Sequence, residues 1–257
     1  MSSHILISLS YSDALNILYR PNITVLKHNI TKKRYNLTSL HFESIYGVSL
    51  SKSDSYRLSF TGASFLLYES IELAKAYAKK GGWDAAVESI LASNVNTQSK
   101  STIKRERNEI ALRLKTLSSP LLEKLINVNP DDAKIIVLYA ILKTYPFIRD
   151  FCLEVLYEKS MILDTHIQEY EINAFFRNQE DRHEAFSKKS DSTKQKLKQV
   201  MFKMLSDAGV LKSTKEKIIM KPYMDTSVSR LIADDGGAIY LKALLMSDAE
   251  IIMLGGK

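Results

Sequence analysis

The sequence predicts a mainly α protein: a helical bundle core with helix-turn-helix or winged-helix elements and a small β-wing. Three observations lead to this fold class. Apolar residues recur at helical spacing over most of the chain after residue 56. Several segments open with helix-capping residues. Among the 257 residues there are only nine glycines and five prolines, so few positions interrupt regular structure.

The first 55 residues differ from the rest of the chain. They are rich in Ser, Asn, Ile, Leu and Tyr, have poor helical periodicity and lack strong helix caps. We therefore expect residues 1–55 to form an N-terminal extension, with regular structure beginning near Tyr56.

From Tyr56 onward, helix signals follow one another at short intervals. Gly81 and Gly82 end the first helix, because glycine is favoured just past a helix C-terminus. Asn129 and Pro130, followed by two aspartates, form a start signal with a cap, a first-position proline and acids at the positive end of the dipole. In chain order, helices are expected at residues 64–80, 83–92, 101–117, from 120, 130–144, 146–161, 170–178, 182–186, 191–209, 227–233 and 238–253, with a turn at 234–237.

The helices from Pro130 and Pro146 are expected to form the central core. Ile135–Leu142 is a run of apolar residues that is too short to cross a bilayer, which needs about 20. The N-terminus has no basic region of the kind that opens a signal peptide. With a single cysteine, Cys152, the composition favours a cytoplasmic protein that does not bind membranes.

Positive charge is concentrated in one segment. The formal charge of the whole chain is +7. Residues 188–221 contain ten lysines and only three acids, so this segment alone has the same excess. It contains no arginine, the residue that most often contacts guanine specifically. Binding to duplex DNA through phosphates, with weak sequence specificity, is therefore the expected function of this segment.

The order of elements in residues 164–222 is that of a winged helix: two short helices, a longer helix, and β-like pieces at 210–211 and 217–220. In the long helix, an apolar stripe is expected to face the core at Leu197, Val200, Met201, Met204, Leu205 and Ala208. Such a helix can enter the major groove of DNA. A basic solvated face, or a module that binds only proteins, would give the same pattern.

The helix from Ser101 is a fainter copy of this unit, with a similar Ser-Thr start and a basic composition. Its apolar stripe is expected at Ile103, Ile110, Leu114 and Leu117. The candidate DNA-binding residues are Lys188, Lys189, Lys194, Lys196, Lys198, Lys203, Lys212, Lys215 and Lys217 in the first unit and Lys100, Lys104 and Arg105 in the second.

Other chemistry has little support in the sequence. Glycine-rich phosphate loops are absent, and five scattered histidines with one cysteine give no metal-binding spacing. Asp131 and Asp132 lie in the first turn of a helix, where nuclease carboxylates are not expected. We expect a non-enzymatic protein without catalytic residues, metal or cofactor, in which Cys152 is a buried thiol.

An ordered series of motifs resembles the BrxA family of bacteriophage-exclusion (BREX) phage-defence systems. The motifs occupy residues 56–62, 82–83, 113–117, 144–151, 175–176, 192–193 with 196–197, 208–211 and 240–248. The resemblance implies a non-enzymatic component of a phage-defence system with a helical core likened to NusB-type bundles, winged-helix elements and affinity for DNA. Other phage-defence proteins are the implied partners.

The leading hypothesis is thus a DNA-binding accessory protein of a defence system. A protein-interaction scaffold and a NusB-like RNA-binding protein are the alternatives. We expect four parts: an extension at 1–55, a helical domain with a basic helix-turn-helix-like unit at 56–163, a winged-helix-like unit at 164–222 and C-terminal helices at 223–257.

Residues 1–55 lie outside the resemblance, and the chain has no Met between Met1 and Met161. A mis-assigned start is our hypothesis for the origin of this segment. We predict that a chain beginning at Ser55 melts at the same temperature and binds DNA with the same affinity as the full chain. A large fall in melting temperature on truncation would show that residues 1–55 belong to the core.

Overall fold

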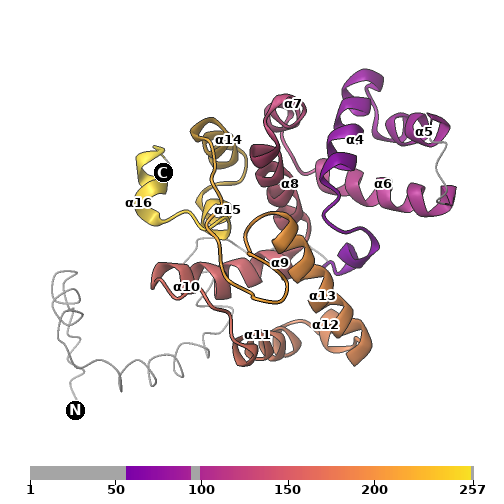
Figure 1. Ribbon diagram of the computed structural model, residues 1–257. Coiled ribbons are helices and arrows are strands. Elements are labelled where there is room, and N and C mark those ends of the chain that lie inside the picture. The colour runs from indigo at the N-terminus through magenta and orange to yellow at the C-terminus, as the bar shows by residue number, and fades with distance from the viewer. Residues whose placement is uncertain (1–55, 94–98, 256–257) are drawn as a thin grey trace, which may run out of the picture. The chain divides into compact units, whose positions relative to one another are not determined.

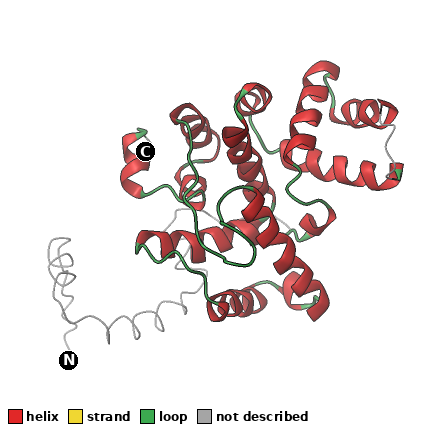
Figure 2. Cartoon of the chain, in the orientation of Figure 1, coloured by secondary structure: helices red, strands yellow, loops and turns green. Residues whose placement is uncertain are grey.

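A computed structural model describes residues 56–93 and 99–255 (Figure 1). The chain divides into two units, residues 1–49 and 50–257, and all of the described residues lie in the second. The expected extension at 1–55 lies outside the described residues. The described part consists of helices joined by loops and contains no strand (Figure 2), which confirms the mainly α class.

The described elements include one 3-10 turn, η1, and one π-helical segment, η2. In chain order they are η1 (Ser59–Gly62), α4 (Leu67–Lys80), α5 (Trp83–Ser93), α6 (Lys100–Leu114), α7 (Ser119–Asn127), α8 (Pro130–Thr144), α9 (Pro146–Phe151), η2 (Cys152–Tyr157), α10 (Glu158–Met161), α11 (Glu169–Arg182), α12 (Glu184–Ser187), α13 (Asp191–Asp207), α14 (Thr226–Gly236), α15 (Ala238–Ala243) and α16 (Asp248–Met253).

Helix α8 is the centre of the packing. Every residue from Ile135 to Leu142 is at most 1% exposed, which confirms the predicted core helix. Helices α4, α6, α7, α9, α14 and α15 all contact it, and Figure 1 shows α14 and α15 on one side of α8 and α4 and α6 on the other. The cap at Asn129 is also as predicted, because its side chain accepts hydrogen bonds from the amides of Asp131 and Asp132.

Some helix boundaries were predicted wrongly. Helix α4 begins at Leu67, later than expected, because Leu66 adopts a left-handed conformation (φ 50°). Two helices were expected at 170–178 and 182–186; the first, α11, runs on to Arg182, and the second, α12, begins at Glu184. Helix α11 begins with a capping box between Gln168 and Glu171 and ends where His183 becomes extended.

The chain from α9 through α10 is one continuous helical run with a π-helical middle. Phe147 and Phe151 on α9 are fully buried and form edge contacts with Phe175 of α11 at ring-centroid distances of 5.4 and 5.1 Å. Phe151 also contacts Phe202 of α13 at 5.5 Å. This aromatic cluster joins the core to α11 and α13. Cys152 is fully buried, as predicted, and burial raises the pKa of its thiol.

A buried arginine ties the start of the fold to α6. The guanidinium of Arg113 is 1% exposed and donates to the backbone carbonyls of Ala63 and Ser64 at 2.5 and 2.7 Å. Its Nε donates to Tyr145 Oη at 2.9 Å, and that hydroxyl donates to Glu109 at 2.5 Å. All these donors have partners, so this buried charge is accommodated without orphaned hydrogen bonds.

The predicted turn at 234–237 begins later than expected. Helix α14 continues through Gly236, and the break comes at Gly237, which has φ +79°. Asp235 belongs to the helix and accepts hydrogen bonds from Tyr139 Oη and Lys143 Nζ, both at 2.7 Å. The carboxylate therefore joins α14 to α8.

The predicted two-stranded wing does not form regular strands. Its two pieces are connected only by an isolated antiparallel bridge, Leu211 to Ile219, and Ile218 forms a second bridge to His166. The intervening residues make a tight turn in which the Lys217 amide donates to the Ser213 carbonyl at 3.1 Å. The pairing is too short to form a ladder. We call residues 210–220 the hairpin.

The packing around Gly236 gives a stability prediction. A Cβ atom at this position would lie 2.2 Å from the hydroxyl of Tyr139, which is held by Asp235. Gly236→Ala should therefore destabilise the protein by about 1–3 kcal/mol through overpacking, measured as a lower Tm in thermal unfolding. Gly82→Ala is the control, since nothing lies within 4 Å of its Cβ position. Equal Tm values for the two variants would contradict the close packing.

Candidate nucleic-acid interface

Helix α13 is anchored by its apolar face. Leu197, Met201, Met204 and Leu205 are at most 1% exposed, and Ala208 is also buried, whereas Val200 is half-buried. The predicted stripe is therefore largely confirmed. Ser190 caps the helix by accepting a hydrogen bond from the Thr193 amide. The orientation of α13 fixes which of its lysines can reach solvent.

The outer face of α13 carries Gln195, Lys196, Gln199 and Lys203, all of which are exposed. Lys194 and Lys198 lie at the sides of the helix, and only 17% and 18% of their side chains are exposed. Both turn toward α11, where Lys194 pairs with Glu180 at 2.7 Å and Lys198 pairs with Glu169. These two candidate lysines therefore flank the outer face of α13, with their amines paired to acids of α11.

Glu169, at the start of α11, holds two lysines at once. One carboxylate oxygen accepts from Lys198 of α13, and the other accepts from Lys217 of the hairpin at 2.9 Å. These hydrogen bonds hold the pKa of Glu169 below its usual range. We call this three-residue arrangement the Glu169 clamp. It joins the hairpin to α13 and pairs two candidate cations with a single carboxylate.

Other candidate cations have acidic neighbours close in sequence or space. In each of the following pairs at least one side chain is more than half exposed, so the contribution to stability is small. The pairs are Lys188 with Glu184 at 2.6 Å, Lys203 with Asp207, Lys212 with Glu216 at 2.9 Å and Lys104 with Glu88 at 2.6 Å.

Five of the twelve predicted residues form no ion pair with a described residue. They are Lys189, Lys196 and Lys215 in the first unit and Lys100 and Arg105 on α6, and all five are exposed. We call them the free cations. The sequence count missed this division, because Glu169, Glu180 and Glu184 precede residues 188–221 in the chain but face that segment in space.

The same cap opens α6 and α13. In each, the sequence is Ser-x-Ser-Thr, and the first serine lies 3.0 Å from the second serine Oγ. The distances from the capping Oγ to the threonine Oγ1 are 2.8 Å in α6 and 2.9 Å in α13. With the caps aligned, Arg105 corresponds to Lys196 and Asn108 to Gln199, and all four are exposed. The predicted similarity of the two helices therefore extends to their exposed positions.

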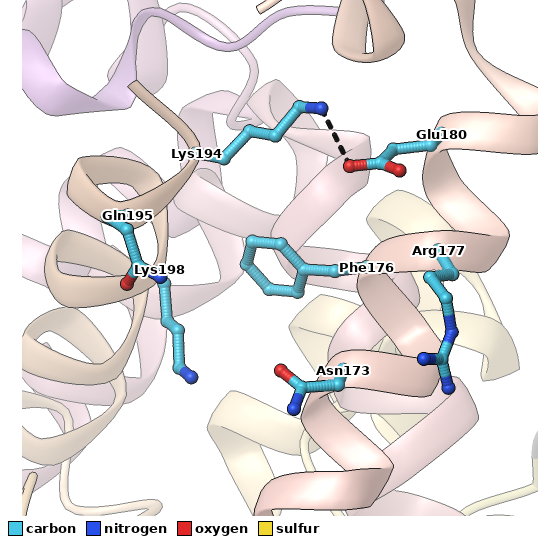
Figure 3. A pocket seen from close by; sticks show the side chains of 7 residues that line it. All are labelled: Asn173, Phe176, Arg177, Glu180, Lys194, Gln195 and Lys198. Atoms are coloured by element: carbon cyan, nitrogen blue, oxygen red, sulfur yellow. Dashed lines mark ion pairs between the residues drawn. The ribbon is translucent and has the colours of Figure 1, made fainter. Parts of the chain in front are cut away.

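A shallow pocket separates α11 from α13 (Figure 3). It is lined by Asn173, Phe176, Arg177, Glu180, Lys194, Gln195 and Lys198. Figure 3 shows Phe176 projecting between the two helices and the Lys194–Glu180 ion pair crossing one end. The pocket mixes charged and amide groups and is open to solvent, so its side chains can contact a polar surface laid against α13.

A sequence model of the BrxA family matches residues 54–236, well over half of the chain. The chain belongs to the BrxA family. The predicted resemblance is thus confirmed. A relative named BREX protein BrxA, from Bacillus cereus (strain H3081.97), is 33% identical over 152 residues, which are 59% of this chain and 75% of the relative.

The fold of this BrxA-family chain also occurs in a solved structure. The crystal structure of an uncharacterized protein from Magnetospirillum magneticum matches with a TM-score of 0.63 and 18% identity, over 75% of this chain and 99% of the other. At that identity the likeness shows the fold alone.

Two kinds of feature are absent from the part of the BrxA-family chain that the structure describes. In it, no group of three or more His, Cys, Asp or Glu side chains could hold a metal ion. No helix in the same residues combines the length and the apolar character that a membrane span requires.

The Glu169 clamp leads to a prediction about DNA affinity when its carboxylate is removed. Glu169→Gln should free Lys198 and Lys217 and increase affinity for duplex DNA. The slope of log affinity against log salt should steepen by up to about 1.8, or 0.9 for each new phosphate contact. Titration of labelled duplex at several salt concentrations measures both quantities.

Glu123→Gln is the matched control, because it removes one negative charge from an exposed position on α7 that forms no ion pair with a described residue. An equal change in both variants would mean that net charge acts at long range and that the clamp has no specific role.

Proposed function

We propose that this protein is a non-enzymatic DNA-binding accessory component of a BREX-type phage-defence system, and that it binds duplex DNA mainly through phosphate contacts. The observation that carries the proposal is the exposure of three of the free cations: Lys189 just before α13, Lys196 on its outer face and Lys215 on the hairpin. Lysines without an acidic partner can neutralise phosphates and release counterions.

The order of elements supports a winged-helix arrangement for this unit. A helical run (α9 to α10) is followed by an extended segment at 165–167, then α11, α12, α13 and the hairpin. The second piece of the hairpin lies between its first piece and the extended segment, since the Ile219 amide donates to the Thr165 carbonyl at 2.8 Å and the Lys212 amide donates to the Ile218 carbonyl at 2.9 Å. In winged-helix proteins, the helix before the hairpin enters the major groove, and α13 occupies that place here.

The proposed division of the chain follows from this arrangement. Residues 164–222 form the main DNA-binding unit, residues 56–163 contain the second basic helix α6, and residues 223–257 form the C-terminal helices. Lys100 and Arg105 on α6 would add contacts to the same or a neighbouring stretch of backbone. The relative's name, BREX protein BrxA, supports other defence proteins as partners.

An interaction scaffold is the second candidate function, and the exposed apolar side chains favour it. Ile162 and Leu163 follow α10 and are 70% and 88% exposed, while Ile252 and Met253 on α16 are 71% and 78% exposed. Leu163 also has a left-handed backbone (φ 58°), which is costly for a branched side chain. These groups suit contact with another protein better than contact with DNA.

The free cations provide the test of DNA binding. The triple variant Lys189→Ala, Lys196→Ala, Lys215→Ala should lower the salt slope by about 2.7, since each lost phosphate contact contributes about 0.9. Stability should change by no more than about 0.5 kcal/mol, because the substitutions are on the surface. Titration of a 20-base-pair DNA duplex, the matching RNA duplex and single strands at several salt concentrations measures the slope for each.

The matched control is Lys75→Ala, Lys79→Ala, Lys80→Ala, which removes the same charge from exposed positions on α4. If the α13 unit binds DNA, the salt slope should fall in the Lys189, Lys196, Lys215 variant and stay unchanged in the control. Equal slopes in both triple variants would favour the scaffold, and stronger binding of the RNA duplex would favour RNA as the ligand.

A further inference from the structure

The outer face of α13 carries two amide side chains besides its cations. Gln195 and Gln199 are both exposed, and neither forms a hydrogen bond with a described residue. They lie one helical turn apart with Lys196 between them. The lysines on the sides of the helix, Lys194 and Lys198, are held by acids of α11. Lys203, also on the outer face, pairs with Asp207, so the groups that point outward without an ion-pair partner among the described residues are Lys196 and the two neutral amides.

The chemistry of the amide decides what it can recognise. A glutamine side chain carries both a donor and an acceptor, so it matches the N6 donor and N7 acceptor of adenine in the major groove. Phosphate oxygens only accept hydrogen bonds, so lysine, a charged group with donors alone, suits them better than an amide does. An amide row beside a phosphate-binding lysine is thus suited to base edges.

The spacing fits a duplex. Residues four apart on a helix are separated by about 6 Å along its axis, and base pairs follow one another at 3.4 Å. Two long side chains can therefore reach neighbouring or next-neighbouring base pairs. In Figure 3, Gln195 lies on the side of α13 that borders the pocket, beside Lys198.

The second basic helix gives an independent observation. When the caps of α6 and α13 are aligned, Gln199 corresponds to Asn108, which is exposed and forms no hydrogen bond with a described residue. Lys196 corresponds to Arg105. The same pair, a free cation followed three residues later by a free amide, thus occurs at the same exposed positions of both helices.

We propose that Gln195 and Gln199 contact adenine edges in the major groove and give this protein a preference for A·T base pairs. The inference rests on the proposed DNA-binding function and deepens it, since it assigns sequence preference to the amides and leaves phosphate attraction to Lys189, Lys196 and Lys215.

The test uses the full chain and three 20-base-pair duplexes: one of mixed A·T sequence, one of G·C sequence, and the A·T duplex with every adenine replaced by 7-deazaadenine. The last duplex keeps all charges and the minor groove but lacks the N7 acceptor. The protein should bind the A·T duplex about tenfold more tightly than either of the others, as expected for loss of a bidentate contact.

The double variant Gln195→Ala, Gln199→Ala should bind all three duplexes equally with an unchanged salt slope. Lys196→Ala is the control, which should lower affinity for all three duplexes by the same factor. Tm measurements establish that each variant is folded.

Two outcomes would overturn the inference: equal binding of the A·T and 7-deazaadenine duplexes by the unaltered protein, or a preference that persists in the double variant. In both cases, binding that still depends on the free cations leaves the proposed function intact. Failure of the unaltered protein to bind any duplex would overturn both proposals.

Discussion

The fold depends on the need to cover α8 on every side. A surface helix normally keeps one polar face in water, but α8 is buried at each position from Ile135 to Leu142. Six helices from both halves of the described chain contact it. Its C-terminal part still carries polar groups, and these explain the next layer of structure. Tyr139 and Lys143 of α8 both donate to Asp235 of α14, so α14 is held where the polar atoms need a partner.

The packing around α8 also determines which helices lie at the surface. Since α4, α6, α14 and α15 cover α8, and α9 is directed into the aromatic cluster, α11 and α13 pack on the far end of that cluster through Phe175 and Phe202. The outward sides of α11 and α13 do not pack against the core. The unit that carries the free cations is thus a peripheral layer, and its exposed side chains can be changed with little effect on the core.

Local patterns in the sequence predicted those features that depend on neighbours along the chain. The cap at Asn129, the apolar face of α13 and the burial of Cys152 each follow from residues within one or two helical turns. Features that depend on distant residues were predicted wrongly or missed. Glu169 is 29 residues from Lys198 and 48 from Lys217, so no local count of charge could show that it pairs with both. The hairpin gains its second bridge from His166, which is also distant in the chain from the β-like pattern that suggested a two-stranded wing.

The division between clamped and free cations limits how tightly one unit can bind. Three free lysines give a salt slope of about 2.7, so a fourfold rise in salt would weaken binding only about 40-fold. Proteins with six to ten phosphate contacts lose about 1,000- to 100,000-fold over the same range. If Lys100 and Arg105 of α6 also bind phosphate, the slope rises to about 4.5. The shared Ser-x-Ser-Thr cap and the matching exposed positions on α6 and α13 then have a physical role, because two modest faces of similar geometry can together give the affinity that neither supplies alone.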